Sequence, residues 1–124
     1  MKDVEIYHLD DLKIEREFGM NIKVCQRLGH FGNKVSLEYV VLDPHTIFNP
    51  HYHDQSDALV LILRGHGYIT DASERKYPIR EGTLAYFPAK TRHGFIAEED
   101  TIHLVAVQSP PLKNLQTGHI DFIE

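Results

Sequence analysis

The chain has 124 residues, with 13 Lys and Arg against 18 Asp and Glu, a formal net charge of −5, and 42% hydrophobic residues. These proportions are typical of a globular protein with one packed core rather than of a disordered chain, and they predict a single domain over residues 1–124. No basic stripe alternates with aromatic residues, so we expect no nucleic acid as a partner.

The sequence also argues against export and against insertion into a membrane. The single cysteine, Cys25, excludes an internal disulfide and fits a reducing compartment. Residues 1–5 mix charged and apolar side chains and lack the apolar run of a secretory signal. The longest apolar run, over residues 58–63, is much shorter than the roughly 20 residues that span a bilayer. We therefore predict a cytoplasmic protein with no membrane partner.

Short β-forming runs separated by turn signals dominate the chain after one short helix. Two aspartates and Gly19 predict that helix over about residues 10–18. The predicted strands then cover residues 35–42, 48–52, 59–63, 68–70, 76–79, 83–87, 93–97 and 102–108. This spacing predicts an all-β, antiparallel sandwich or barrel with its core over about 35–111, an N-terminal segment over 1–34 and a C-terminal tail over 112–124.

Residues 58–63, Ala-Leu-Val-Leu-Ile-Leu, are apolar on both faces of a predicted strand. Because strand side chains alternate between the two faces, both faces of this strand need cover. One face would line the interior of the barrel. The other would pack against a second sheet, the N-terminal segment or another subunit, so the sequence makes a homodimer one of the hypotheses.

Three histidines on two β-rich segments predict a metal site. His51 and His53 are two residues apart, which puts both rings on one face of a strand, and His93 begins a later strand. Neutral imidazole binds zinc, iron, copper and nickel well. We therefore predict a divalent transition metal, which could be Fe, Ni, Zn, Mn or Cu. The alternative is a set of hydrogen-bonded barrel histidines without a metal.

The spacing of these residues resembles the two signature motifs of the cupin superfamily, Gly-x5-His-x-His-x(3 or 4)-Glu-x6-Gly and Gly-x5-Pro-x-Gly-x2-His-x3-Asn. The first motif is matched by His51, His53 and Gly65, and the second by Gly82, Pro88 and His93. The resemblance extends over about residues 37–111. It implies a small jelly-roll barrel, the antiparallel double-stranded β-helix, with the three histidines as metal ligands.

The chain departs from these motifs at four positions. His45 and Lys90 stand where the motifs have Gly, and Ala97 stands in place of the Asn. His45 would have to accept the backbone geometry of the usual Gly, and histidine is among the residues that tolerate a positive φ. Most consequentially, Ala58 stands where the motif has its ligand Glu, and Asp57 lies one position away.

Two arrangements of this strand are open. In one, Ala58, Val60 and Ile62 point inward, Asp57 points away, and three histidines hold the metal. In the other, a shorter turn brings Asp57 to the metal as a fourth ligand. We favour the three-histidine site, because a shift of one residue turns every side chain of a strand to the opposite face.

A candidate substrate pocket follows from the same alternation. Apolar side chains around a few polar groups are how small-molecule sites are usually built, although plain core packing explains the apolar members equally well. A histidine that faces inward at position 103 could orient a ligand, and an exposed strand histidine is the alternative. The predicted pocket residues are Tyr39, Gln55, Val60, Ile62, Phe95 and His103.

A metal held by three neutral histidines keeps its positive charge and open coordination positions. It can bind a chelating ligand, lower the pKa of bound water or, if it is iron, activate dioxygen. The resemblance implies dioxygenases that act on diketones and thiols as the specific enzyme class, and isomerases as a related one. The alternative is a non-catalytic cupin that binds or senses a sugar or an organic acid. No catalytic acid or base is evident from the sequence, and only Asp57, His103 and Tyr39 are candidates.

Overall fold

The protein is described here from a computed structural model, which covers residues 3–12, 15–19, 22–114 and 116–124, with side chains described for 3–12, 31–114 and 116–124. These residues form a 3-10 turn at Leu9–Asp11 and ten strands: β1 Glu15–Gly19, β2 Ile22–Phe31, β3 Val35–Leu42, β4 Ile47–His51, β5 Asp57–Arg64, β6 Gly67–Asp71, β7 Lys76–Ile79, β8 Leu84–Phe87, β9 His93–Ala97 and β10 Ile102–Ser109. No helix within the described ranges has the length and apolar character needed to cross a membrane.

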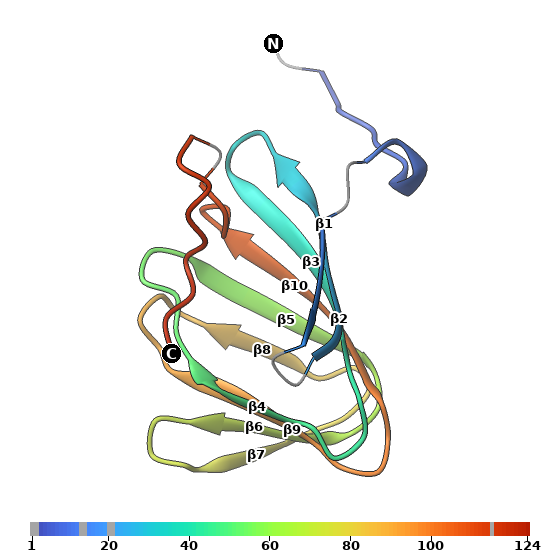
Figure 1. Ribbon diagram of the computed structural model, residues 1–124, viewed down its shortest axis with the longest axis vertical. Helices are drawn as coiled ribbons and strands as arrows, with labels where there is room; N and C mark the ends of the chain where they lie inside the picture. Colours follow the sequence, from blue (N-terminus) through green and yellow to red (C-terminus); the bar gives the residue numbers. More distant parts are fainter. Residues whose placement is uncertain (1–2, 13–14, 20–21, 115) are drawn as a thin grey trace.

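The strands form two antiparallel sheets that face each other (Figure 1). The larger sheet has the order β1-β2-β3-β10-β5-β8, and the smaller has the order β4-β9-β6-β7. From β3 to β10 the chain changes sheet at every connection except the β6–β7 hairpin. This alternation is the jelly-roll topology, so the predicted all-β antiparallel class is confirmed.

The eight strands predicted after residue 35 correspond to β3–β10, and the bounds of β7 and β9 are those predicted. The start of the chain differs from the prediction. The helix expected over residues 10–18 is only the 3-10 turn at Leu9–Asp11, and residues 15–19 form β1 instead. β1 pairs with β2, which pairs with β3 and so extends the larger sheet beyond the expected barrel core. Sheet pairing therefore overrides the local helix signals, and residues 13–14 lie outside the described ranges.

The core lies between the two sheets and is built from alternate strand positions. On β5, Val60 and Ile62 are buried, whereas Leu59 and Leu63 point outward and are exposed. Ile102 at the start of β10 has no exposed surface. Apolar inward-facing residues of β3, β5 and β10 therefore make most of one wall of the core, against which the smaller sheet packs.

Gly67, the first residue of β6, lies where the chain leaves no room for a side chain. A Cβ atom there would stand 2.1 Å from the carbonyl oxygen of Ile96, a backbone atom of the paired strand β9. We expect Gly67→Ala to lower the free energy of unfolding by about 3 kcal/mol or more, because the strands must separate to admit the methyl group. Urea denaturation followed by circular dichroism would measure this loss.

Gly82 provides the matched control for that prediction. It has a φ of +87° but nothing within 4 Å of its added Cβ, so Gly82→Ala introduces backbone strain without a clash. We expect it to cost only about 1–2 kcal/mol. A loss at Gly67 no larger than the loss at Gly82 would contradict the prediction.

Candidate metal centre

The three histidines predicted as ligands lie together in the interior, at one side of the two-sheet structure. His51 ends β4 and is paired in register with His93, the first residue of β9, and His53 follows two residues after His51. Their exposed fractions are 5%, 6% and 4% for His51, His53 and His93. The ring centroids are 4.4–5.4 Å apart, and the candidate ligand atoms all lie within 4.8 Å of one another. The structure thus brings all three rings into one cluster.

Each ring makes the same hydrogen bond with its Nδ1 atom. The Nδ1 of His51 lies 3.2 Å from the carbonyl oxygen of Asn49, that of His53 lies 2.6 Å from Asp121 O, and that of His93 lies 2.8 Å from Thr91 O. A carbonyl oxygen can only accept, so the Nδ1 atom carries the proton in all three rings. The lone pairs of the neutral rings are therefore on Nε2, and the donor set fits a divalent transition metal.

Two phenylalanines pack flat against these rings. Phe122 stacks on His51 with a centroid distance of 4.4 Å and an interplanar angle of 22°, and Phe87 stacks on His93 at 3.9 Å and 5°. These contacts restrict rotation of the imidazoles and cover one face of each ring. The orientation of the Nε2 atoms is thus set by packing as well as by hydrogen bonds.

Burial keeps two of the three rings, His51 and His93, neutral. The pKa of His51 is lowered to about 3, first by burial and then by the nearby His93, while hydrogen bonding to Asn49 opposes the shift. The pKa of His93 is lowered to about 4, chiefly by burial. Both rings are therefore unprotonated near neutral pH, the state in which imidazole binds a metal.

The C-terminal segment, residues 112–124, contributes directly to this site. The sequence predicted only a tail there. The carbonyl of Asp121 accepts the proton of His53 Nδ1, and its carboxylate accepts hydrogen bonds from the backbone N–H groups of Asp54, Gln55 and Ser56 at 2.6–3.0 Å. In Figure 1 the segment runs along one side of the two sheets. Asp121 therefore fixes both the ring of His53 and the turn that follows it.

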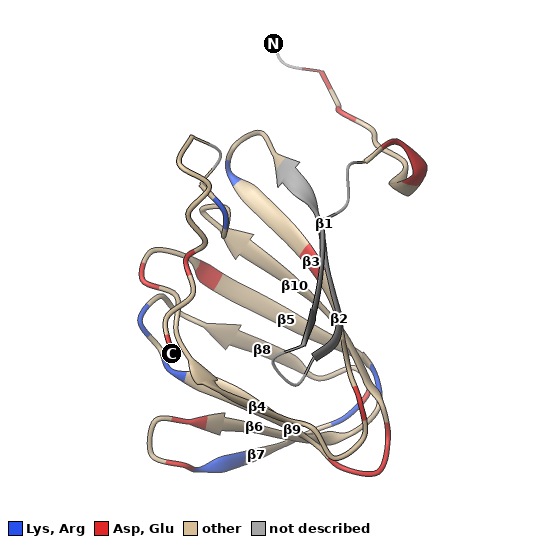
Figure 2. Ribbon diagram, viewed as in Figure 1, with Lys and Arg blue, Asp and Glu red and all other residues tan. Residues whose placement is uncertain are grey.

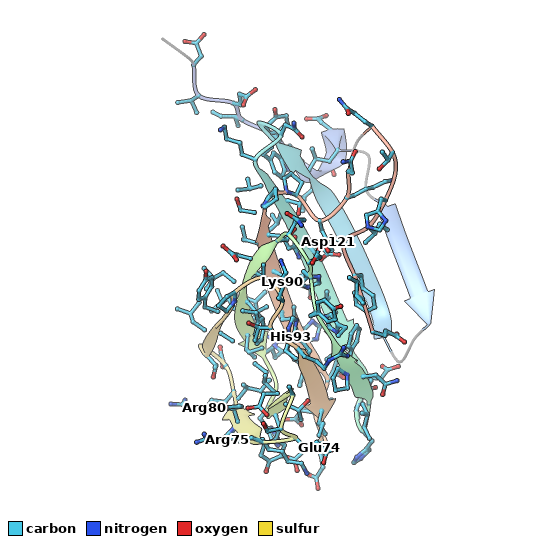
Figure 3. All side chains as sticks on the ribbon, turned by 90° about the vertical axis from the view of Figure 1, so that its left-hand side faces the viewer. Glu74, Arg75, Arg80, Lys90, His93 and Asp121 are labelled. Atoms are coloured by element: carbon cyan, nitrogen blue, oxygen red, sulfur yellow. The ribbon has the colours of Figure 1, made fainter. Side chains whose placement is uncertain are left out.

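The loop before β9 holds the site from the other side. The backbone N–H of Lys90 donates to the carbonyl of His53 at 2.7 Å. In the view of Figure 3, Lys90 lies between Asp121 and His93. Lys90 has a φ of 69° and His45 has a φ of 61°, so both residues that replace motif glycines adopt the left-handed conformation, as predicted for His45.

Asp57, considered above as a fourth ligand, does not face the cluster. Its side chain is exposed, and its Oδ1 atom accepts a hydrogen bond of 2.8 Å from the backbone N–H of Ala89. Ala58 is 3% exposed and points inward. The strand thus has the first of the two arrangements, because Ala58, Val60 and Ile62 share the buried face and alternation turns Asp57 outward.

A cavity of about 320 Å³ opens beside the three histidines. Two predicted pocket residues, Val60 and Phe95, line it, whereas Ile62 is packed in the core and Gln55 lies exposed in the turn. Three residues of the C-terminal segment, Leu112, Ile120 and Phe122, also line the cavity, and the sequence did not predict them. The lining consists of Glu38, Val40, Leu42, Phe48, His51, His53, Ala58, Val60, His93, Phe95, Leu104, Ala106, Gln108, Leu112, Ile120 and Phe122.

The prediction that Tyr39 and His103 line the pocket is wrong. They lie on the outer face of the larger sheet, where Tyr39 Oη and His103 Nδ1 are 2.6 Å apart. On β3 it is Glu38 and Val40 that face the cavity. Leu42, the last residue of β3, is buried, and every second residue before it shares its face, so the packing of the two sheets turns Glu38 and Val40 inward.

Solved structures of the same fold include several enzymes. The polyketide cyclase RemF from Streptomyces resistomycificus is 18% identical, with a TM-score of 0.68 over 87% of this chain and 80% of its own. Ectoine synthase from P. lautus is 20% identical, with a TM-score of 0.70 over 88% and 80%. Pac13 from Streptomyces, a nucleoside dehydratase, is 17% identical, with a TM-score of 0.72 over 98% and 95%. These likenesses support the fold.

Comparison with curated protein sequences gives no significant match. A family model described as "Cupin domain" does match, over residues 38–108. This range runs from β3 to β10 and contains all three histidines and both motifs that carry them. Because the match covers more than half of the sequence, the chain belongs to the cupin domain family.

Proposed function

We propose that the protein is a metal-dependent enzyme that acts on a small, oxygen-bearing organic molecule. The observation that carries this proposal is the common hydrogen bond from the Nδ1 atoms of His51, His53 and His93 to backbone carbonyls. It leaves three Nε2 lone pairs in one buried cluster beside a cavity of about 320 Å³. No ring has to be reoriented before a metal binds, which favours a resident metal over three purely structural histidines.

Each part of the site has a distinct role in this proposal. His51, His53 and His93 would hold the metal, which would supply a positive charge that polarises an oxygen of the bound molecule. Phe87 and Phe122 keep two of the rings in place and exclude water from them. The apolar lining would hold the carbon skeleton of the molecule. The named neighbours are a cyclase, a synthase and a dehydratase, but the fold alone does not choose among reactions.

The first test is the metal content of protein purified without a nickel column. We expect about one divalent ion per chain, among Fe, Ni, Zn, Mn and Cu, measured by plasma mass spectrometry. Protein that takes up none of these ions at saturating concentration would contradict the proposal.

The reaction we propose to test first is dioxygenation, in which O2 is incorporated into the bound compound, because it is the activity that the family resemblance implies. Protein loaded with Fe(II) would be supplied with diketones, thiols and catechols in an oxygen electrode. Oxygen uptake that depends on both the metal and the compound would support a dioxygenase. Turnover without oxygen uptake would point to an isomerase or a lyase. Saturable binding of organic acids without any turnover would identify a non-catalytic binding protein instead.

We also propose that the protein is a homodimer through the outer face of the larger sheet. By strand register, Leu37, Val107, Leu59 and Tyr86 lie side by side across β3, β10, β5 and β8. Three of them are substantially exposed: Val107 at 38%, Leu59 at 45% and Tyr86 at 60%. Figure 2 shows few charged residues on these strands. This exposed apolar row supports the proposal of an interaction site on the outer face of the sheet.

We expect Leu59→Asp to convert the dimer to a monomer in sedimentation velocity, because the interface would have to bury a charge. Ile47→Asp is the matched control, since Ile47 is a 56% exposed aliphatic residue on the other sheet and should leave the dimer intact. A wild-type protein that sediments as a monomer at high concentration would contradict the proposal.

A further inference from the structure

Ala58 and Gln108 form a buried pair on the wall of the cavity beside the histidines. They lie directly opposite each other on β5 and β10, they are 3% and 2% exposed, and both line the cavity. On its other side Ala58 is paired with Phe87 of β8, the residue that stacks on His93. Because the side chain of Ala58 is a single methyl group, this row of the sheet leaves space between the histidine cluster and the amide of Gln108.

The amide of Gln108 has a hydrogen-bond donor to spare. Its nitrogen donates to Glu38 Oε1 at 2.6 Å, and its oxygen accepts a hydrogen bond of 2.7 Å from Ser36 Oγ. A primary amide nitrogen carries two N–H groups, and among the residues with described side chains the second one has no acceptor. A buried donor without a partner costs free energy, so an acceptor on a bound molecule would be stabilised here.

The cavity wall next to the histidines carries no negative charge on the described residues of β4, β5 and β9 that line it. Glu38, the carboxylate in the lining, comes from β3, which is two strands from β5. The Asp121 carboxylate accepts three backbone N–H groups of the turn at 54–56 and does not line the cavity. A divalent ion held by three imidazoles keeps its positive charge, and a buried charge needs a counter-charge. A bound anion would supply it.

We propose that the molecule bound in the cavity is a carboxylate with a second oxygen on the adjacent carbon, as in a 2-oxo acid, and that its carboxylate lies over Ala58. One of its oxygens would face the histidine cluster, and another would accept the spare N–H of Gln108. The apolar lining would surround the carbon chain. This inference rests on the proposed metal centre and names the class of molecule that the centre takes. Ala58 determines specificity in it, because a larger side chain would fill the same space.

Titration calorimetry on the zinc-loaded protein would compare an anionic probe with a neutral one. 2-Oxopentanoate and hexane-2,3-dione share a propyl chain and two adjacent oxygen-bearing carbons, but only the first is an anion. We expect the oxo acid to bind at least about tenfold more tightly. Gln108→Leu should weaken binding of the oxo acid by at least about tenfold, the loss typical of one hydrogen bond to a charged group, without changing the affinity for zinc. Gln116→Leu is the matched control, because it removes an exposed amide outside the cavity lining.

Ala58→Glu tests the position itself. The added carboxylate would fill the space over residue 58 and supply the counter-charge from the protein. We therefore expect zinc to bind at least about tenfold more tightly and 2-oxopentanoate at least about 100-fold more weakly. Ala58→Gln fills the same space without a charge, so it should also exclude the oxo acid but should keep the zinc affinity within about threefold of the wild type.

Equal affinity of the wild type for the two probes, or no binding of either probe to zinc-loaded protein, would overturn the inference. Undiminished binding of the oxo acid by Gln108→Leu or by Ala58→Glu would overturn it as well. Circular dichroism would show which variants are folded, and the Ala58 variants keep the inference testable if Gln108→Leu is not. Failure of the wild type to bind zinc would instead overturn the proposed function, so the two failures are distinguishable.

Discussion

Replacing His93 with alanine is expected to weaken the binding of a divalent transition metal by at least about 100-fold. The substitution removes one of three Nε2 donors from a cluster whose candidate ligand atoms lie within 4.8 Å of one another. Changes to residues that merely orient a ligand cost 10–100-fold in metal affinity, so loss of the ligand itself should cost more. Competition between the protein and a chromogenic chelator for Zn²⁺ would measure the dissociation constants.

His103→Ala is the matched control for this experiment. It removes the same side chain from the larger sheet, but His103 lies on the outer face, where it contacts Tyr39 instead of the cavity. We expect its metal affinity to equal that of the wild type. Circular dichroism of both variants would show that each is folded. If His93→Ala and His103→Ala bound zinc equally well, the cluster would not be the metal site.

The metal-free protein is expected to lose stability steeply as the pH falls from about 6.5 to 5. The pKa values of His51 and His93 in the folded state are lowered to about 3 and about 4, from an ordinary value of 6.5. Below pH 6.5 the unfolded chain therefore binds protons at both residues that the folded chain does not bind. The stabilisation is complete above pH 6.5 and is lost as the pH falls toward the folded-state values.

One pH unit changes the free energy of unfolding by about 1.4 kcal/mol for each such histidine. From pH 6.5 to pH 5 the two residues together would account for about 3 kcal/mol, because the slope reaches its full value only below pH 6.5, and this is a large part of the stability of a small protein. Urea titrations of the chelator-treated protein between pH 7 and pH 5 would measure this slope. His93→Gln, which removes one of the two groups, should reduce the slope by about half. A free energy of unfolding that stays constant over this interval would exclude the predicted linkage.

The metal-loaded protein should behave differently in the same titration. A bound ion that contacts only the folded chain raises its stability by mass action, so excess Zn²⁺ should increase the free energy of unfolding at pH 7. The increase should shrink at acid pH, because protons and metal compete for the same Nε2 lone pairs. This comparison separates an effect of the metal from an effect of burial alone.

Much of the fold could be read from the sequence because its signals are local. β-Branched and aromatic runs between turn residues predicted eight strands, and the bounds of β7 and β9 were predicted without error. Alternation along a strand likewise predicted that His51 and His53 share one face, and the match to the second motif added His93. Even the left-handed conformation of His45 followed from the glycine that it replaces in the motif.

Contacts between distant segments could not be read in this way. Which face of β3 points inward depends on how its sheet packs, and choosing the wrong face put Tyr39 in the pocket and left out Glu38. The helix expected near the N-terminus depends on local propensity, which the pairing of β1 with β2 overrides. Asp57 is turned outward by alternation, and the partner of its carboxylate, the N–H of Ala89, is far away in the sequence.

The sequence by itself determined the all-β class, the positions of most strands and the placement of His51 and His53 on one face, because each of these depends on residues that are close together in the chain. Only the tertiary structure decided that Asp121 and Phe122 of the C-terminal segment hold His53 and His51, and that Glu38 and Gln108 face them across a cavity. Those arrangements depend on hydrogen bonds and packing between residues more than sixty positions apart. No local pattern in the sequence encodes them.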